Sequence, residues 1–353
     1  MTASLAPLRA AVIGTGFIGL DHAAAYAADP GAELVAVVDP DIKRANATAA
    51  VHGALAYPTV AAMVEGSTPD VVSVCVPTAL HLPVVREVAA AGLHILLEKP
   101  MAATVDDCDT IAAACRESGV TLMLGLTHRF HRELIEARQL IAAGAIGRPT
   151  MVQDTFAFGE HGPWPAWYYD QALAGGGELM HDGVHLVDRL AWLIDSPIEE
   201  VYGRTTSATR GIAGVEDGGV AVLTFADGTI GTLFVYEATH PLRSDATSVP
   251  MPGRLELEIH GERGSIRYRT WHELIVDIAG QPSRTVTNVV RDDMASEIAE
   301  FLAAVREGRP ASVGPAEGRR GIAVVQAIYA SERLGRPIRV DDLFPAPPES
   351  AGW

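Results

Sequence analysis

Residues 10–19 read A-A-V-I-G-T-G-F-I-G, a short apolar run followed at once by three spaced glycines. A G-x-G-x-x-G turn between a strand and a helix is typical of a dinucleotide-binding βαβ unit. Gly14 would permit the tight turn, Gly16 would let the backbone approach a pyrophosphate, and Gly19 would allow close packing of helix on strand. We therefore expect a helix over residues 17–28 with an anion at its N-terminus.

An acidic residue follows at the spacing that this kind of unit uses. Asp39 comes twenty residues after Gly19, at the end of a predicted strand over residues 33–38. A carboxylate there can hydrogen-bond both ribose hydroxyls and would repel a 2′-phosphate, which favours NAD over NADP. Lys43 and Arg44 lie nearby and keep NADP as an alternative. The cofactor contacts predicted from this region are Gly14, Thr15, Gly16, Phe17, Ile18 and Asp39.

Short apolar strands alternate with helical segments up to about residue 126. Such continuous apolar runs are expected when helices cover both faces of a parallel sheet. The predicted fold is therefore α/β, with an N-terminal Rossmann domain, a doubly wound parallel sheet, over residues 1–126. Besides those above, the predicted strands are 71–76, 94–97 and 121–124, and the predicted helices are 41–51, 80–91 and 105–118.

The pattern changes after residue 126. Residues 127–312 are predicted to form an α+β domain with a large open, mainly antiparallel or mixed sheet and helices on one face. Asp227-Gly228 fits a hairpin turn, and residues 240–253 are expected to form a mobile loop. Residues 313–353 are expected to add a final helix and strand that pack near the N-terminal domain. The predicted strands are 150–158, 201–208, 220–225, 229–236, 255–260, 265–269 and 274–278, and the predicted helices are 133–143, the segment from the G-G-G to about 194, 294–307 and 317–334.

Composition excludes several classes of function. The 353 residues suffice for two domains, 48% are hydrophobic, and the formal net charge is −17. A duplex or an anionic membrane would repel such a surface, so neither nucleic acid nor a membrane is an expected partner. Cys75, Cys108 and Cys115 lack metal-site or disulfide spacing and are expected to be buried or idle thiols. Without a signal peptide or an apolar run of about 18 residues, a cytoplasmic location is expected.

Four further motifs follow the glycine turn, and their order along the chain is informative. V-P-T-A-L-H at 76–81, E-K-P at 98–100 and G-G-G-E-L-M-H-D-G-V-H-L-V-D at 175–188 follow the glycine turn, and a closing helix and strand occupy 315–340. Together they resemble the Gfo/Idh/MocA family, the relatives of glucose–fructose oxidoreductase and inositol dehydrogenase. The resemblance covers nearly the whole chain.

The resemblance implies pyridine-nucleotide redox chemistry on a sugar, cyclic polyol or related alcohol. It assigns Lys99 a place near the nicotinamide and the reacting hydroxyl, and it makes His185 the usual acid/base group. It also implies that the open sheet forms a homodimer or homotetramer. The further cofactor contacts that it implies are Pro77, Thr78, His81, Glu98 and Lys99, with His81 structural or close to the cofactor rather than catalytic.

The chemistry of these two side chains agrees with that assignment. Oxidation of a C–OH group requires removal of the hydroxyl proton, and an imidazole such as that of His185 titrates in the right range. An ammonium such as that of Lys99 can stabilise developing alkoxide charge. The cofactor would carry the redox step.

One position departs from the family pattern. Many relatives have aspartate four residues before the catalytic histidine, whereas this chain has His181 followed by Asp182. Spacings of three and four on a helix would let both converge with His185. Either they act catalytically or bind substrate hydroxyls, or Asp182 is structural. A metal bound by Glu178, His181 and His185 is a weaker alternative, and no metal is expected.

Other candidate substrate contacts lie outside this helix. Arg129 could contact substrate or cofactor, or could form an ion pair between domains, and Asp188 and Arg189 are expected at the helix surface or between domains. An aromatic segment before the G-G-G could form a substrate wall or could simply pack under a long loop. Its members are His161, Trp164, Trp167, Tyr168 and Tyr169.

Two other functions are compatible with the same residues. The first is an enzyme of the same family in which bound NAD enables elimination or glycoside cleavage without net NADH. The second is a regulator that binds a dinucleotide without catalysis, although Lys99 and His185 argue against it. The leading hypothesis remains hydride transfer between NAD and a secondary alcohol, ketone or hemiacetal of a sugar or polyol.

Overall fold

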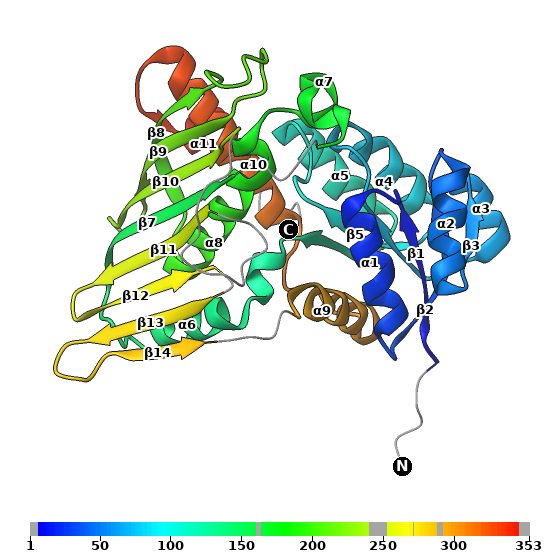
Figure 1. Cartoon of the computed structure of the whole chain (residues 1–353), viewed down its shortest axis with the longest axis horizontal. Coiled ribbons are helices and arrows are strands. Elements are labelled where there is room, and N and C mark those ends of the chain that lie inside the picture. The colour runs from blue at the N-terminus through cyan, green and yellow to red at the C-terminus, as the bar shows by residue number, and fades with distance from the viewer. Residues whose placement is uncertain (1–5, 160–163, 240–252, 271, 288–291, 346–353) are drawn as a thin grey trace. The chain divides into compact units, whose positions relative to one another are not determined.

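The computed structural model describes residues 6–159, 164–239, 253–270, 272–287 and 292–345. These residues form two compact units (Figure 1), of which the first comprises 6–127 and 292–319 and the second comprises the described parts of 128–287 and 320–345. Residues 292–312, which the sequence analysis assigned to the second domain, thus lie in the first unit.

The first unit is built on a six-stranded sheet in which every pairing is parallel. Its order, β3-β2-β1-β4-β5-β6, is that of a dinucleotide-binding Rossmann fold, as predicted. The short strand β3 and the helix after it were not predicted, because three half-exposed residues carry no apolar run. The strands are β1 (Leu8–Ile13), β2 (Ala32–Val38), β3 (Leu55–Tyr57), β4 (Val71–Val74), β5 (His94–Glu98) and β6 (Leu122–Gly125).

Local capping explains where several helices of this unit begin. The Asp41 carboxylate accepts a hydrogen bond from the backbone N–H of Lys43, and Thr59 and Thr104 cap later helices in the same way. Helix α9, distant in sequence, packs against α1. The helices are α1 (Phe17–Ala28), α2 (Ile42–His52), α3 (Val60–Ser67), η1 (Thr78–Leu80), α4 (His81–Ala90), α5 (Val105–Glu117) and α9 (Asp293–Glu307).

The second unit contains a nine-stranded sheet of order β14-β13-β12-β11-β7-β10-β9-β8-β15. Strands β7 and β10 are parallel and the other pairings are antiparallel, so the predicted mixed sheet is confirmed. Asp227-Gly228 turns between β9 and β10, with Gly228 at φ 86°. The strands are β7 (Pro149–Phe158), β8 (Ile198–Thr206), β9 (Gly218–Phe225), β10 (Ile230–Glu237), β11 (Gly253–Gly261), β12 (Gly264–Arg269), β13 (Glu273–Ile278), β14 (Arg284–Thr287) and β15 (Ile338–Arg339).

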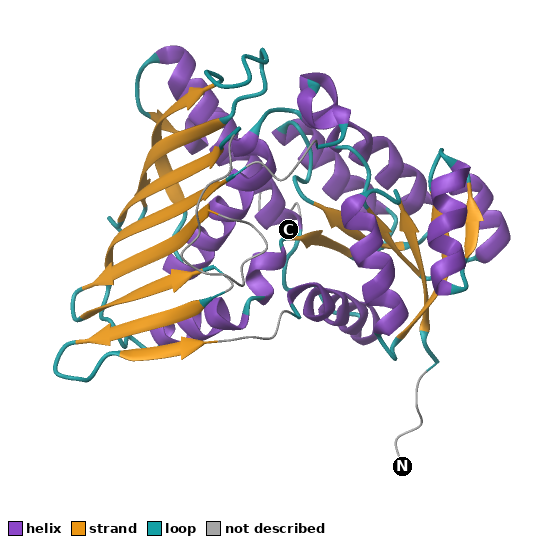
Figure 2. Cartoon of the chain, in the orientation of Figure 1, coloured by secondary structure: helices purple, strands orange, loops and turns teal. Residues whose placement is uncertain are grey.

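One face of this sheet is covered and the other is open. Helices α6 and α8 lie along the covered face (Figure 2), and β9 and β10 alternate buried with exposed residues. The open face carries the exposed side chains of Val220, Val222, Ile230 and Phe234. The remaining helical segments, of which α10 spans residues of both units, are η2 (Thr127–Phe130), α6 (Arg132–Ala142), η3 (Ala166–Tyr169), α7 (Gln171–Ala174), η4 (Leu179–Gly183), α8 (Val184–Ile194), α10 (Pro315–Leu334) and α11 (Val340–Leu343).

Several smaller predictions can also be compared with the structure. Cys75, Cys108 and Cys115 are buried and unpaired, as expected. Among the described residues, no helix has both the length and the apolarity needed to cross a membrane. His161 and residues 240–252 of the predicted loop lie outside the described part of the chain.

Candidate active site

The glycine turn after β1 has the close approaches that its sequence implies. Gly14 has φ 94°, and a Cβ there would overlap the carbonyl oxygen of Cys75. A Cβ at Gly19 would overlap the Gly14 carbonyl oxygen, so α1 can pack this closely only without a side chain. A Cβ at Gly16, by contrast, would meet nothing within 4 Å. The middle glycine therefore borders open space, as a glycine beside a cofactor should.

Asp39 ties this turn to the end of β2. Its Oδ2 accepts hydrogen bonds from the backbone N–H (3.0 Å) and the hydroxyl (2.9 Å) of Thr15. Its Oδ1 accepts from the Asp41 N–H and from Arg44 Nη2, both at 2.9 Å. Burial disfavours the ionised form, but the hydrogen bonds from Thr15 and Asp41 and the charge of Arg44 lower the pKa of Asp39. Asp39 is therefore a fixed carboxylate beside the turn.

These residues fit a dinucleotide. The α1 N-terminus begins at Gly16 without a side-chain cap, and no acidic residue occupies its first turn. An uncapped helix N-terminus presents N–H groups and a partial positive charge, which suit a pyrophosphate. Phe17 is 73% exposed at this end of the helix. Gly14, Thr15, Gly16, Phe17 and Ile18 are therefore placed together as predicted, although their cofactor contacts remain a prediction.

His81 joins two other loops at the same edge of the sheet. One ring nitrogen lies 3.0 Å from the Val76 carbonyl oxygen and the other 3.2 Å from that of Met101. Burial lowers the pKa of His81. It thus connects the loop that contains Pro77 and the buried Thr78 to the chain that follows E-K-P. The sequence favours a structural role or a position close to the cofactor; these contacts agree with the first, and the second stays a prediction.

Glu98 is the last residue of β5 and Lys99 follows it, and the two side chains have different environments. Glu98 is buried, and its Oε2 accepts a hydrogen bond from the Lys99 backbone N–H at 2.9 Å. Burial opposes ionisation of Glu98, but the contacts with His22 and Lys99 lower its pKa. Lys99 is only partly buried. Glu98 therefore fixes the backbone from which the Lys99 side chain projects.

In the second unit, Glu216 holds the start of the segment that bears the histidines. Its carboxylate accepts hydrogen bonds from the N–H groups of Gly177 and Leu179, each at 2.9 Å, and from the Tyr329 hydroxyl at 2.7 Å. Cβ atoms at Gly176 and Gly177 would clash with Tyr329 and with the Glu216 backbone. The triple glycine is thus needed for packing as well as for turning.

The histidine segment begins with a π-turn, Leu179–Gly183, before α8. Such turns occur mostly inside α-helices and frequently at functional sites. His181, in this turn, is 3% exposed and stacks on Tyr168, with ring centroids 4.0 Å apart. Trp164 stacks on the Tyr168 ring at 5.1 Å, and its Nε1 donates to Glu237. The aromatic segment is therefore built around His181.

His185 has a different aromatic partner. It is 5% exposed and stacks on His128, with ring centroids 4.1 Å apart. His128 Nδ1 lies 3.4 Å from Nη1 of Arg189, which can only donate, so Nδ1 is the acceptor. Arg189 and Asp154 form a fully buried ion pair. His185, the catalytic candidate, thus stacks on the His128 ring, whose orientation is set by the buried Arg189–Asp154 ion pair.

The spacing of His181, Asp182 and His185 predicted one regular helix face, but the segment begins with a π-turn, and the two imidazoles have different ring partners. Asp182 is partly exposed. Within the described residues, His22, Glu98 and Glu297 are the one set of three metal-ligating side chains that come together. Glu178, His181 and His185 do not form such a set.

Arg129 and its neighbours are paired inside the second unit. Arg129 donates to both oxygens of Asp188, at 2.8 and 2.6 Å, and its guanidinium lies over the Trp192 ring. The expectation that Asp188 and Arg189 lie at the helix surface or between domains is wrong, because both are buried and form ion pairs inside the second unit. Arg129 therefore forms an ion pair, the second of the alternatives, although within one unit.

Sequence reasoning missed three residues of this site. Glu216 accepts a hydrogen bond from the glycine segment, and Glu237 accepts one from Trp164. His128 stacks on the ring of His185. Glu216 and Glu237 come from distant strands or loops, so no spacing could have found them. His128 directly precedes Arg129, and its position after the last strand of the first unit was a usable signal.

Two family profiles match the chain. One, described as an oxidoreductase family with an NAD-binding Rossmann fold, matches residues 8–126. The other, described as the GFO/IDH/MocA C-terminal domain, matches residues 134–267. The two matches follow each other in the order seen in the structure.

Individual relatives agree with these matches. The inositol 2-dehydrogenase of Rubrobacter xylanophilus is 27% identical over 347 residues, covering 95% of this chain and 93% of the relative. The D-glucoside 3-dehydrogenase of Escherichia coli is 33% identical over 201 residues, 56% of each chain. The solved WlbA dehydrogenase of Bordetella pertussis, in complex with NADH and UDP-GlcNAcA, is 27% identical with a TM-score of 0.81, covering 94% of this chain and 97% of that one. The chain therefore belongs to the Gfo/Idh/MocA family of oxidoreductases.

Proposed function

We propose that this chain is an NAD-dependent dehydrogenase that acts on a secondary alcohol or hemiacetal of a sugar, cyclic polyol or sugar derivative. The observation that carries the proposal is the glycine turn, with open space at Gly16 and the Asp39 carboxylate beside it, in a member of an oxidoreductase family. The names of its relatives, inositol and glucoside dehydrogenases, support the substrate class.

The bound cofactor would supply the hydride acceptor. The α1 N-terminus would hold its pyrophosphate, and Asp39 would hold the adenosine ribose. The Asp39 carboxylate supports NAD as the cofactor, while Arg44, 2.9 Å from it, could pair with the extra phosphate of NADP. Pro77, Thr78 and Glu98 would complete the nicotinamide end of the site from the neighbouring strand ends.

We assign the proton and charge chemistry to Lys99 and His185. His185 would accept the hydroxyl proton, since a positioned imidazole is the commonest general base. Lys99 would stabilise the developing alkoxide. The residue type of Lys99 supports this assignment. The chain contains two lysines, Lys43 and Lys99, and all its other strongly basic side chains are arginines. Arginine cannot lose its proton in a protein, whereas lysine can.

The stacked rings of the second unit would recognise the substrate. Trp167 and Tyr168 are partly exposed and pack with the buried ring of His181, and such rings commonly line small-molecule sites. We propose that they contact the C–H face of a sugar ring and that His181 and Asp182 bind its hydroxyls. We propose that Arg129, held by its ion pair with Asp188, supports the site rather than contacting the substrate directly.

A substrate panel tests the proposal. Purified protein would be mixed with NAD or NADP and with inositols, aldoses, glycosides and anhydrosugars, while both reduced nicotinamide and products are measured. Substrate-dependent NADH would support the dehydrogenase. Substrate consumption without NADH would instead identify elimination or cleavage by bound NAD. Cofactor binding without any turnover would indicate a regulator.

The residue assignments need their own variants. We expect Lys99→Met and His185→Asn to lower kcat/KM by roughly 10²- to 10⁴-fold, the usual contribution of a positioned acid/base group. The controls are Lys43→Met, the other lysine, and His260→Asn, an exposed histidine of the second unit. Activity of Lys99→Met or His185→Asn equal to that of its control would remove that residue from the mechanism.

We also propose that the enzyme works as a homo-oligomer. The open face of the nine-stranded sheet exposes apolar side chains on its central strands, including Val220, Val222, Ile230 and Phe234. A contiguous exposed apolar patch commonly marks a protein interface. The buried, unpaired cysteines agree with a reducing compartment, which supports the cytoplasm as its location.

A further inference from the structure

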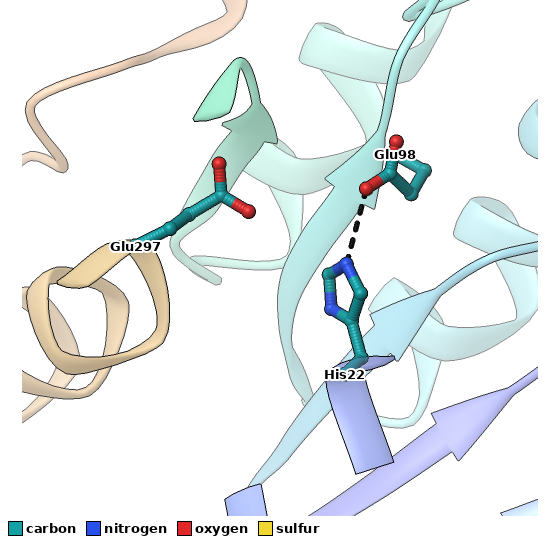
Figure 3. A group of neighbouring side chains, drawn as sticks. All are labelled: His22, Glu98 and Glu297. Carbon is teal, nitrogen blue, oxygen red and sulfur yellow. Dashed lines mark hydrogen bonds and ion pairs between the residues drawn. The ribbon is translucent and has the colours of Figure 1, made fainter. Parts of the chain in front are cut away.

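Three buried side chains from distant parts of the sequence meet inside the first unit. His22 comes from α1, Glu98 from the end of β5 and Glu297 from α9, and each offers one ligand atom within 4.8 Å of the others. Figure 3 shows the Glu297 carboxylate directed toward the other two side chains. Of the three, only Glu98 also belongs to the proposed cofactor site, and the proposed proton chemistry uses none of them.

The hydrogen bonds around His22 define which of its nitrogens faces the group. His22 Nδ1 lies 2.9 Å from the Ser73 hydroxyl, which donates its proton to the Tyr26 hydroxyl oxygen at 3.0 Å. Because Ser73 has one proton, it must accept from Nδ1, so Nδ1 carries hydrogen. In a neutral imidazole, Nε2 then presents a lone pair toward Glu98 Oε1, 3.0 Å away. With a neutral His22, two acceptors would therefore face each other.

Glu297 adds two more acceptors that have no partner. Its side chain is 0% exposed, and neither carboxylate oxygen has a hydrogen-bond partner among the residues that the structure describes. Glu98 satisfies only Oε2 through a backbone group, the Lys99 N–H. A buried polar atom without a partner is costly, and a buried unpaired charge costs more. With His22 neutral, the three side chains therefore place no positive charge at the point where they meet.

We propose that His22, Glu98 and Glu297 form a binding site for a divalent cation of the kind that takes mixed nitrogen and oxygen ligands, such as Mn²⁺ or Zn²⁺. Two carboxylates with a neutral imidazole carry two negative charges, which one such ion neutralises. Two ligand atoms of one ion lie at most about 4 to 5 Å apart, twice the usual metal–ligand distance, and the three ligand atoms here all lie within 4.8 Å of one another.

The surroundings of His22 match those of a metal ligand. Ligating histidines generally donate their other ring N–H to a neighbouring polar group, which fixes the tautomer and the ring orientation. The Ser73 and Tyr26 hydroxyls, both buried, perform this task for Nδ1. The ion would connect α1, β5 and α9, and through Glu98 it would fix the backbone of Lys99. The site does not depend on the proposed substrate.

The competing arrangement uses protons instead of a metal. One proton would lie between His22 and Glu98, and a second would neutralise Glu297. Burial, with the charges of Glu98 and Asp293, raises the pKa of Glu297, which favours that second proton. The two arrangements differ in what copurifies with the protein and in how Glu297→Gln behaves, since an amide can replace a protonated carboxyl but binds a cation poorly.

Metal analysis of the full-length protein decides between them. Wild type, Glu297→Gln and the control Glu307→Gln, an exposed position on the same helix, would be produced in cells supplied with Mn²⁺ or Zn²⁺ and purified with a chelator. Because the site is buried, loading during folding is the appropriate condition. We expect about one ion per chain in wild type and Glu307→Gln and none in Glu297→Gln, with a lower unfolding temperature in the unloaded protein.

Ser73→Ala provides a variant that keeps all three ligands. Loss of a hydrogen-bond partner of a ligating histidine typically weakens metal binding about 10- to 100-fold, so we expect this loss in a Mn²⁺ competition assay. A wild-type protein that contains no metal would overturn the proposal and would favour the arrangement in which protons neutralise the group. Equal metal content in wild type and Glu297→Gln would also overturn it, because the ion would then lie elsewhere.

Discussion

Asp39 offers the sharpest test of how the first unit selects its cofactor. In the structure, its Oδ1 holds Arg44 Nη2 at 2.9 Å, and Asp41 is a second, more exposed partner of the same arginine. Asp39→Ser removes the negative charge and also releases Arg44, whose guanidinium could then pair with a 2′-phosphate. We expect this single change to shift preference from NAD toward NADP.

The size of the shift follows from the charge removed. Two unit charges about 4 Å apart interact by about 1 kcal/mol in water and about 4 kcal/mol near a protein surface. Because about 1.4 kcal/mol is a tenfold change in affinity, the ratio of NADP to NAD affinity should rise between about fivefold and a thousandfold. Damage to the glycine turn through the lost Thr15 contacts weakens both cofactors and cancels in this ratio.

The assay is a pair of fluorescence titrations with NADH and NADPH. Asp41→Ser is the control, because serine can still cap α2. The 3.7 Å contact that Asp41 makes with Arg44 is solvent-exposed, so its loss should change the binding free energy little. We expect that control to change the ratio by no more than about twofold. An Asp39→Ser protein whose ratio equals that of Asp41→Ser would refute the reasoning about this carboxylate.

Three further predictions concern the second unit. Burial, and after it the charges of Asp182 and Glu237, raise the pKa of Glu178, so the contribution of this group to stability falls as pH rises above about 4.5. The melting temperature of Glu178→Gln should therefore rise relative to that of wild type between pH 5 and pH 8. A difference in melting temperature that stays constant over this range would contradict this. Asp154→Ala should cost about 3 to 5 kcal/mol by chemical denaturation, since it leaves the Arg189 charge buried and unpaired, and a loss below about 1 kcal/mol would exclude that role. Phe234→Glu, at a 41% exposed position on the open sheet face, should give a monomer in light scattering, whereas an unchanged mass would place the interface elsewhere.

Features with a local cause could be predicted from sequence. The glycine turn, α1 and Asp39 follow one another within thirty residues, and each has a distinct physical requirement. The parallel strands of the first unit are apolar because helices cover both faces, which made all but β3 recognisable. The mixed sheet of the second unit was recognisable from its turns and its alternating pattern.

Features that depend on distant partners could not be predicted. A regular helix was expected through His181, but the segment begins with a π-turn anchored by Glu216. Asp188 and Arg189 look like surface charges in sequence, yet each is buried beside a partner of opposite charge from another element. The partner of Glu98, His22, is likewise 76 residues away.

The proposed reaction is direct hydride transfer from a sugar or polyol carbon to NAD. The most direct measurement uses a substrate identified by the panel, deuterated at the carbon that is oxidised, with mass analysis of the reduced nicotinamide from wild type and from His185→Asn. We predict one deuterium in each NADH that wild type forms, and slow but equally labelled NADH from the variant. Product formed without deuterium in the nicotinamide would contradict the account.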